Sequence, residues 1–276
     1  LDVRTETITV AGGRPGELEI RATVHGPIVS GLTDDFTAIA SDPRMGTIGE
    51  PQDLASAPEG EYAVSLRWTA LDAGNTASAV FAINAASNWT EFRAAAQLFE
   101  VPAQNLVYAD IEGNIGYQTP GRLPIRGASD GSMPSPGWDS RYDWTGMIPF
   151  DELPTVYNPP EGFIVTANNA VVGTDYPYFL THDWDYGWRA ARIVSLLERA
   201  IAAGPLTVED MRRIQADNEF WIGKRLISAY SDISVEDAQT TAALALLEDW
   251  DAQNSAGSSA AAYANVFWRN LVTEMF

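Results

Sequence analysis

Two side-chain amides and two guanidiniums follow one another along a short part of the chain and could handle developing negative charge. Asn168 and Asn169 come directly after an apolar run at 163–165, and Arg189 and Arg192 follow an aromatic loop. An amide at a rigid strand end, held by a guanidinium, can stabilise the oxyanion of an acyl-transfer reaction. The alternative is that the two asparagines only turn the chain, because Asn tolerates the left-handed backbone region. The local sequence by itself favours the turn.

A strand and a helix would have to position these four side chains. The run at 163–165 is rich in β-branched residues and is bounded by Gly162 and the asparagine pair, which predicts a buried strand. Apolar residues at helical spacing predict a helix over 189–203. The amides are therefore expected at a strand end and the two arginines in the first turn of a helix.

The composition argues against several kinds of site. Formal net charge is −20, with 17 Lys+Arg against 37 Asp+Glu, so a nucleic-acid partner is not expected. No stretch approaches about 20 apolar residues, so no membrane span is expected. The chain has no cysteine, and His25 and His182 are its only histidines, too few for an ordinary zinc site. His25 is more typical of a packed, hydrogen-bonded residue, and His182 of a surface or packing group, than of a catalytic base.

The first half of the chain has the patterns of β structure. Alternating runs at 6–10 and 17–24 flank a glycine-rich turn and predict a hairpin, with a short extension at 26–29. Another alternating run predicts a strand at 62–68. The stretch 42–60 is rich in Pro, Gly and acidic residues and is expected to be a loop.

One helix and one strong hairpin are predicted next. Apolar residues share a helical face over 84–99, and Asn88 with Glu91 has the spacing of a capping box. The segment 105–117 predicts two strands joined through a Gly-Asn turn. Its acidic residues lack the remaining ligands of an EF-hand, so a tight turn starting at Asp110 is the better interpretation.

The segment 121–160 is dense in Pro, Gly and Trp and is expected to be a long, folded, side-chain-packed excursion. Aromatic-lined loops are also places where small apolar ligands bind. Helices are then predicted to open at Thr207 and Ser234, and a further one over 265–276. The prediction is an α+β chain with strands and long loops over about 1–186 and helices over about 187–276.

A series of short segments keeps its order and spacing through nearly the whole chain. They are TVHGPIV at 23–29, NWTEF at 88–92, QNLVYADIEGNIGY at 104–117, PGRLPIRG at 120–127, WTGMIPF at 144–150, NPPEGFIVTANN at 158–169, DYPYF at 175–179 and RAARI at 189–193. In combination they resemble the penicillin acylase (penicillin amidase) family of N-terminal nucleophile hydrolases. Each segment alone is weak evidence for this resemblance. The 104–117 hairpin followed by the segment that ends in Asn-Asn is specific for the family.

This resemblance implies a four-layer αββα core built from two chains that are cut from one precursor. The nucleophile is the serine at the amino terminus of the larger, β chain, and its own α-amine is the base. The oxyanion is held by a backbone N–H and an asparagine, which corresponds to Asn168. An arginine that orients this amide corresponds to Arg189, with Arg192 as the fallback. The substrate class is a linear small-molecule amide, and family members are exported, so a periplasmic or secreted origin is expected.

The chain also departs from the family pattern. Leu1 has neither hydroxyl nor thiol, and the opening hairpin matches a region inside the family's β chain. The whole of 1–276 is therefore expected to be part of a β-chain domain, inactive alone, with the α chain and an upstream β segment as its partners. Ser87 and Ser132 are internal and have no free amine, so both are rejected as nucleophiles.

No cofactor is required by this mechanism, although some relatives bind a structural calcium. Asp183, Asp185 and backbone near Gly131 fall in the corresponding region, which makes a calcium site a possibility.

Two other functions remain open. Nine tryptophans and an acidic surface would suit a non-catalytic module that binds an aromatic, peptide or carbohydrate ligand, and the many acids would suit a carboxylate-pair glycosidase.

Overall fold

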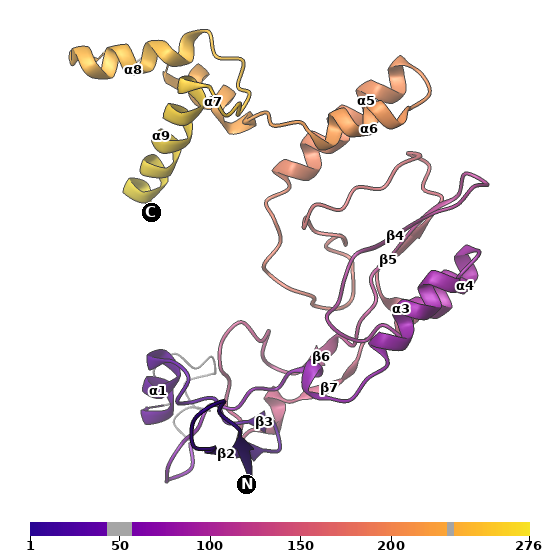
Figure 1. Cartoon of the computed structure of the whole chain (residues 1–276), viewed down its shortest axis with the longest axis vertical. Coiled ribbons are helices and arrows are strands. Elements are labelled where there is room, and N and C mark those ends of the chain that lie inside the picture. The colour runs from indigo at the N-terminus through magenta and orange to yellow at the C-terminus, as the bar shows by residue number, and fades with distance from the viewer. Residues whose placement is uncertain (43–56, 231–234) are drawn as a thin grey trace. The chain divides into compact units, whose positions relative to one another are not determined.

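The computed structural model describes residues 1–42, 57–230 and 235–276. These residues form two compact units, Leu1–Trp184 and Asp185–Phe276. Every strand of the described ranges belongs to the first unit, whereas the second is built from helices and the segments between them (Figure 1). The predicted α+β class, β-rich in its first half and helical in its second, is confirmed.

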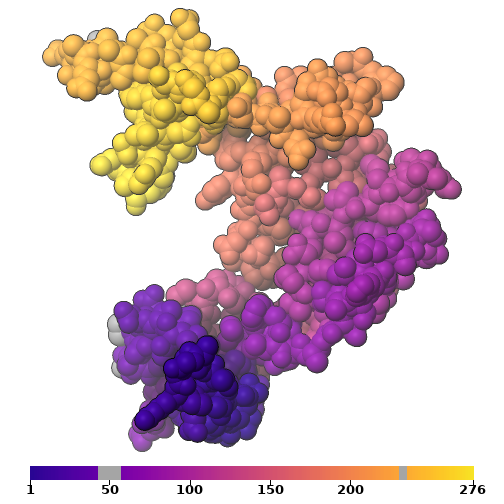
Figure 2. Space-filling view, in the orientation of Figure 1, coloured from indigo at the N-terminus to yellow at the C-terminus, as the bar shows by residue number. Residues whose placement is uncertain are grey.

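The first sheet is antiparallel and has the order β1-β2-β3, formed by β1 (Asp2–Ile8), β2 (Gly16–Thr23) and β3 (Gly26–Pro27). β1 pairs with β2 along its whole length, which confirms the predicted hairpin and the short extension after it. Every residue of β1 is exposed, and Figure 2 shows the indigo amino-terminal segment at the surface.

The prediction of a strand at 62–68 is wrong. Ser65 makes only an isolated antiparallel bridge with Ile28, supported by flanking backbone hydrogen bonds of 2.8 and 2.9 Å. The segment 62–68 lies beside the end of β3, which is only two residues long. It therefore forms this one bridge and no continuous strand. The loop predicted at 42–60 lies mostly outside the described residues.

The second sheet has the order β4-β5-β8 and contains the hairpin that the sequence predicts most strongly. β4 (Leu106–Ala109) and β5 (Ile115–Gln118) pair antiparallel, and β8 (Thr155–Tyr157) adds to the other edge of β5. Gln118 is fully buried in this sheet. The hairpin is confirmed.

Asp110 organises the turn between β4 and β5. Its Oδ1 accepts hydrogen bonds from the backbone N–H groups of Glu112 and Asn114, both at 2.9 Å. Its Oδ2 accepts from the Asn114 side-chain amide at 2.8 Å and from the Tyr108 hydroxyl at 2.9 Å. These hydrogen bonds, led by that of the Asn114 side chain, hold the pKa of Asp110 below its usual range. The predicted tight turn is confirmed, and both oxygens of the Asp110 carboxylate accept hydrogen bonds within the hairpin.

The helix predicted over 84–99 is instead the second of two short helices, α3 (Thr76–Ala85) and α4 (Trp89–Ala96). Asn88 separates them, because its side-chain oxygen accepts from Glu91 N at 3.0 Å and caps a new helix. The predicted cap is therefore correct and the predicted extent is wrong. The two helices pack against each other, and α4 also contacts β5 (Figure 1).

An aromatic cluster joins α4 to the second sheet. The Trp89 ring lies 5.7 Å from Phe92, 5.5 Å from Tyr108 and 5.2 Å from Tyr157, measured between ring centroids. Contacts at these distances add to the free energy of burying the rings. A glycine opposite Trp89 makes room for this packing, since a Cβ at Gly116 would lie 2.5 Å from the indole Cζ3.

Replacing Gly116 with alanine is expected to destabilise the first unit by about 1–3 kcal/mol, because the Trp89 ring or the β5 backbone would have to move. Gly16→Ala is the matched control: it lies on β2, and a Cβ there meets no atom within 4 Å. Urea denaturation followed by tryptophan fluorescence measures both variants. Equal stabilities for the two would contradict the packing described.

The excursion at 121–160 is folded, as predicted. β6 (Pro124–Arg126) and β7 (Trp144–Met147) form a two-stranded antiparallel sheet. Tyr142, Ile148 and Leu153 are buried along it. Among the described residues of the first unit, the other helical segments are α1 (Asp34–Ser41) and the 3₁₀ turns η1 (Thr69–Leu71), η2 (Ser140–Tyr142) and η3 (Phe150–Glu152).

The second unit is helical, and α5 packs with α6, α7 with α9, and α8 with α9. Its helices are α5 (Trp188–Ala203), α6 (Val208–Gln215), α7 (Trp221–Tyr230), α8 (Ala238–Glu248) and α9 (Ser259–Met275). A complete capping box between Thr207 and Asp210 confirms the predicted start of α6. The start predicted at Ser234 lies outside the described residues; α8 is capped by Asp237, and α7 was not predicted.

None of the helices within the described ranges combines the length and the apolar character that crossing a membrane would require.

Candidate functional site

The segment before the asparagine pair does not form the predicted strand. Residues 163–166 have no assigned strand, and none of the described strands pairs with them. A strand needs a partner for its backbone groups, and β8 ends at Tyr157 on the edge of its sheet. The burial predicted for this run is correct only in part, because residues 163–166 are half-buried and, in this stretch, Ala167 alone is fully buried.

The two asparagines have different roles in the turn. Asn169 Oδ1 accepts from Ala167 N at 3.0 Å, and its amide nitrogen donates to Ala170 O at 3.0 Å. Asn168 adopts the left-handed conformation with φ of 61°, and its side chain is exposed beside the buried Ala167. A non-glycine residue at such a φ is uncommon and favours Asn. The turn predicted as an alternative is therefore present, and the amide of Asn169 stabilises it.

The aromatic loop after this turn is fixed to η3. The Tyr176 hydroxyl donates to Glu152 O at 2.8 Å, and the Tyr178 hydroxyl donates to the Glu152 carboxylate. The hydrogen bond to Glu152 raises the pKa of Tyr178. The rings of the two tyrosines also contact each other edge to face. One glutamate thus holds the loop on the same unit as Asn168.

Arg189 belongs to the first turn of α5, in the second unit, as predicted. Asp185 lies just before the helix; its Oδ1 accepts from Gly187 N at 3.0 Å, and its Oδ2 accepts from Arg189 Nε and Nη2 at 3.3 Å. The Arg189 side chain is 58% exposed. Gly187 is the N-cap of α5 with φ of 84° and supplies no side-chain cap, so Asp185 takes over part of that role.

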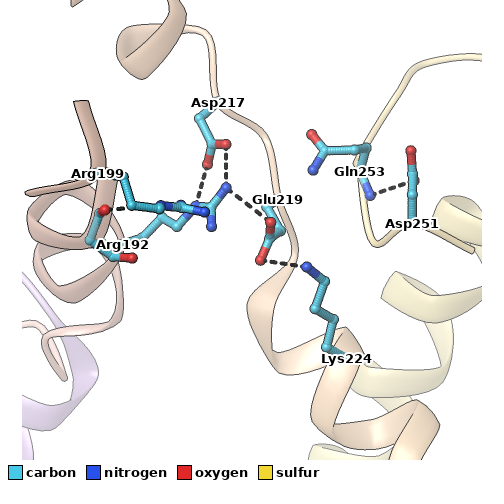
Figure 3. Close-up of polar contacts among 8 residues, drawn as sticks. Arg192, Arg199, Asp217, Glu219, Lys224, Asp251 and Gln253 are labelled. Carbon is cyan, nitrogen blue, oxygen red and sulfur yellow. Dashed lines mark hydrogen bonds and ion pairs between the residues drawn. The ribbon is translucent and has the colours of Figure 1, made fainter. Parts of the chain in front are cut away.

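Arg192 is one turn further along α5 and lies in a half-buried ion network (Figure 3). Its Nε donates to Asp217 Oδ2 at 2.8 Å and its Nη2 to Asp217 Oδ1 at 2.6 Å. The same Nη2 lies 2.9 Å from Glu219 Oε2, and Lys224 Nζ lies 3.0 Å from Glu219 Oε1. No sequence pattern points to Asp217 or Glu219, because neither is near Arg192 along the chain.

The Arg192 guanidinium holds the pKa of the Asp217 carboxyl below its usual range, mainly through the hydrogen bond between them. A carboxyl whose pKa is lowered by folding contributes stability above its unfolded pKa and loses it as the pH falls through the folded pKa. Wild type should therefore have a higher thermal midpoint than Asp217→Asn. The difference between the two midpoints should be largest above about pH 5 and should shrink below about pH 4. Differential scanning calorimetry across this range measures it; a gap independent of pH would contradict the ion pair.

The other sequence candidates have local partners. His25 Nε2 lies 2.9 Å from Asp143 Oδ1, so the predicted hydrogen-bonded histidine is confirmed. His182 is exposed, contacts Phe179 and lies 3.2 Å from Asp130, as predicted for a surface or packing group.

The two rejected serines are also held locally. The Ser87 hydroxyl donates to Glu91 at 2.8 Å, and the Ser132 hydroxyl donates to Asp130 at 2.7 Å. Each of these hydrogen bonds ends on a carboxylate a few residues away and belongs to a helix start or a turn.

No three His, Cys, Asp or Glu side chains gather as a metal-binding group among the described residues. The Asp185 carboxylate is engaged by Arg189 and by Gly187 N, and the backbone N–H of Asp183 donates to the Thr181 hydroxyl. The present contacts therefore do not fit a cation at Asp185. Calcium at Asp183 or Asp185 stays a prediction, and no chemical step is assigned to it.

A cavity of about 1470 Å³ lies in the first unit, away from the asparagine turn. His25, Trp138 and Trp144 are among its lining residues, and Asn168 is not. The indole N–H of Trp138 is buried with no hydrogen-bond partner within the described part of the chain. Aromatic residues of the 121–160 excursion are thus among those that line this cavity.

Comparison with known proteins gives consistent matches along the chain. A model of the penicillin amidase family matches residues 1–276. The penicillin acylase 2 proenzyme of a Pseudomonas species is 32% identical over 275 residues, which cover 97% of this chain and 31% of that protein. The acyl-homoserine lactone acylase QuiP of Pseudomonas fluorescens is 28% identical over 295 residues, which cover 99% of this chain and 32% of that protein.

Among solved structures, a thermostable penicillin G acylase from Alcaligenes faecalis matches with a TM-score of 0.65 and 26% sequence identity. The match covers 91% of this chain and 41% of that one, so the chain spans well under half the length of its relatives. The α+β arrangement described above is accordingly part of an N-terminal nucleophile hydrolase fold. With the family model matching every residue, the chain belongs to the penicillin amidase family.

Proposed function

We propose that this chain is part of an amide hydrolase that transfers an acyl group to an N-terminal serine on a preceding segment, with Asn168 as an oxyanion-hole donor. The relatives are named as penicillin acylases and acyl-homoserine lactone acylases, and both names describe cleavage of a linear amide. The resemblance to this family supports an attacking serine on a segment that precedes the part matched here. The remaining segments of the precursor are thus its proposed partners, in a periplasmic or secreted protein.

The observation that carries the proposal is the left-handed, exposed position of Asn168 in a turn that Asn169 stabilises. Asn169 makes two hydrogen bonds within the turn, and Asn168 is an exposed residue in the left-handed conformation. A non-glycine residue in the left-handed region costs free energy, and such positions cluster at functional sites.

Arg189 is the arginine that we assign to orienting the Asn168 amide. Arg192, the fallback, directs its Nε and Nη2 to Asp217 and Glu219 inside its own unit. Removing it from these two carboxylates would leave buried charge without compensation. Arg189 is more exposed than Arg192, and its guanidinium contacts the carboxylate of Asp185 just before the helix. These contacts support Arg189 over Arg192.

In the proposed reaction the serine hydroxyl attacks the amide carbonyl while the serine's own α-amine takes the proton. Negative charge develops on the carbonyl oxygen and is stabilised by the N–H of Asn168 and by a backbone N–H on the preceding segment. The ammonium then protonates the leaving amine as the C–N bond breaks. Water hydrolyses the resulting ester by the same route in reverse.

Labelling the full-length processed protein with a radioactive sulfonyl fluoride tests the position of the nucleophile. We expect one adduct per molecule, on the N-terminal serine of a peptide outside the sequence 1–276, with loss of amide hydrolysis in parallel. An adduct on Ser87 or Ser132 would contradict the proposal. Ligand binding with no hydrolysis of any acyl amide would instead support the alternative of a binding module.

A further inference from the structure

We propose that the cavity in the first unit is a binding site for a small organic monocarboxylate, held by the guanidiniums of Arg67 and Arg126 and by the indole N–H of Trp138. The three side chains line a space of about 1470 Å³, which is ample for a drug-sized ligand. Asn168 does not line this cavity, and the inference does not rest on the proposed hydrolysis.

Two guanidiniums share the ring of Trp144, which also lines the cavity. The Cζ of Arg67 lies 4.9 Å from the ring centroid, and the Cζ of Arg126 lies 5.7 Å from it. Across 1–42, 57–230 and 235–276, neither guanidinium has a hydrogen bond or an ion pair with a carboxylate, although the chain has 37 Asp+Glu against 17 Lys+Arg. Two positive charges near one ring repel each other, and an anion bound beside them would offset that repulsion.

Arg126 is half-buried, and burial lowers the pKa of its guanidinium, an effect that Asp130 opposes. The Asp130 carboxylate is itself engaged, because it accepts from the Ser132 hydroxyl at 2.7 Å and lies 3.2 Å from His182 Nε2. Arg126 has thus lost part of its hydration without gaining an ion pair among the described residues. A carboxylate in the cavity would supply that partner, and a guanidinium can hold it with two parallel hydrogen bonds.

Trp138 contributes a donor that has lost water without gaining an acceptor. Its Nε1 is buried and has no hydrogen-bond partner in the part of the chain that the structure describes. The indole lies against Tyr62, with ring centroids 5.8 Å apart. Because an indole N–H can only donate, the partner that it needs is an acceptor. A carboxylate has acceptors for this N–H and for a guanidinium, whereas a cation or a purely apolar molecule has none.

Paired backbone positions the two arginines. Arg126 ends β6 and lies opposite Trp144, the first residue of β7, in the antiparallel register. Gly131 packs on the Arg126 guanidinium, since a Cβ at this glycine would lie 2.6 Å from Cζ. On the other segment, the backbone N–H of Leu66 donates to the backbone of β3 at 2.9 Å, one residue before Arg67. The site is therefore built on elements that are already held in place.

The rest of the lining favours a single negative charge on an apolar body. Glu59, Glu61 and Asp143 also line the cavity, and Asp143 lies 2.9 Å from His25. In a chain of net charge −20, these carboxylates would repel a phosphate dianion more strongly than a monocarboxylate. Apolar side chains can cover a hydrocarbon or aromatic ring. Those that line the cavity include Val24, Ile28, Leu66 and Met133.

Isothermal titration calorimetry of the full-length processed protein tests the site with benzoate as the probe. Benzamide has nearly the same shape and no charge, and it should bind at least tenfold more weakly. Arg126→Gln is expected to raise the Kd for benzoate at least tenfold, because a hydrogen bond to a charged group is lost. Trp138→Phe keeps an aromatic ring and removes the N–H, and it should raise the Kd about fivefold. The matched control is Arg212→Gln, which removes the same charge from an exposed arginine of α6 and should leave the Kd within twofold.

Arg67→Gln provides the same test if Arg126→Gln fails to fold, and it should raise the Kd about threefold because Arg67 is exposed. An unchanged Kd for benzoate in folded variants of Arg67, Arg126 and Trp138 would overturn the proposal, since the carboxylate would then bind elsewhere. Absence of benzoate binding by wild type would also overturn it and would leave an acidic side chain of another precursor segment as the acceptor. Tighter binding of phenylphosphonate than of benzoate would overturn the choice of a monocarboxylate.

Discussion

Replacing Asn168 with glycine in the full-length processed enzyme is expected to lower kcat by about 10²–10³-fold with little change in KM. Glycine accepts the left-handed conformation of Asn168 without strain, so the change removes the amide and leaves the turn intact. Loss of an oxyanion donor acts on the transition state, where the negative charge is present, and hardly on the bound substrate. Initial rates with a chromogenic phenylacetyl anilide and with an acyl-homoserine lactone measure the effect for two acyl groups.

Two further substitutions at Asn168 sharpen this test. Asn168→Asp keeps the shape but places a negative charge beside the oxyanion, so it should lower kcat at least as far as glycine does. Asn168→Ala should add a stability loss of about 1 kcal/mol, because alanine is strained at this φ. The control is Asn270→Ala, an exposed asparagine on α9, which should leave kcat unchanged. A kcat within twofold of wild type for Asn168→Gly would remove Asn168 from the mechanism.

The 276-residue chain produced by itself is expected to hydrolyse neither substrate above the buffer rate. Asn168 and Arg189 are proposed to stabilise the oxyanion, and the attacking serine is proposed to lie on a preceding segment. Without a nucleophile, an oxyanion donor has no tetrahedral intermediate to stabilise. Co-expression with the rest of the precursor should restore turnover.

This result is informative only if the isolated chain is folded, which circular dichroism and the melting of its tryptophan fluorescence can establish. A folded chain that is inactive alone and active on co-expression fits the proposal. Enzyme-like turnover by the isolated chain, abolished by Asn168→Gly, would show that the nucleophile lies within 1–276 and would contradict it.

The parts of the fold that the sequence predicted are those set by neighbouring residues. The turn at Asp110 and the caps at Asn88 and Thr207 are made by side chains that bond to backbone within four residues, so a short pattern contains them. The run at 163–165 failed as a strand because strand formation depends on a partner elsewhere, which no local pattern specifies.

The candidate site was predictable only in part for the same reason. The order of the family segments predicted Asn168 and Arg189 as candidates, although the local pattern at Asn168 favoured a simple turn. The hydrogen bonds of Asn169 show why, since that turn does exist beside the proposed donor. The partners of Arg192 were not predictable, because Asp217 is on a different segment and only the packing of α5 against the α6–α7 connection joins them.

The contact between Trp89 and β5 has a consequence for engineering this chain. Because the indole occupies the volume where a Cβ at 116 would lie, the two positions cannot be varied independently. In a combinatorial library that randomises position 116 alone, most variants should be less stable than wild type. One that pairs larger residues at 116 with smaller ones at 89 keeps the total side-chain volume constant, and such compensated pairs are where folded variants should be recovered.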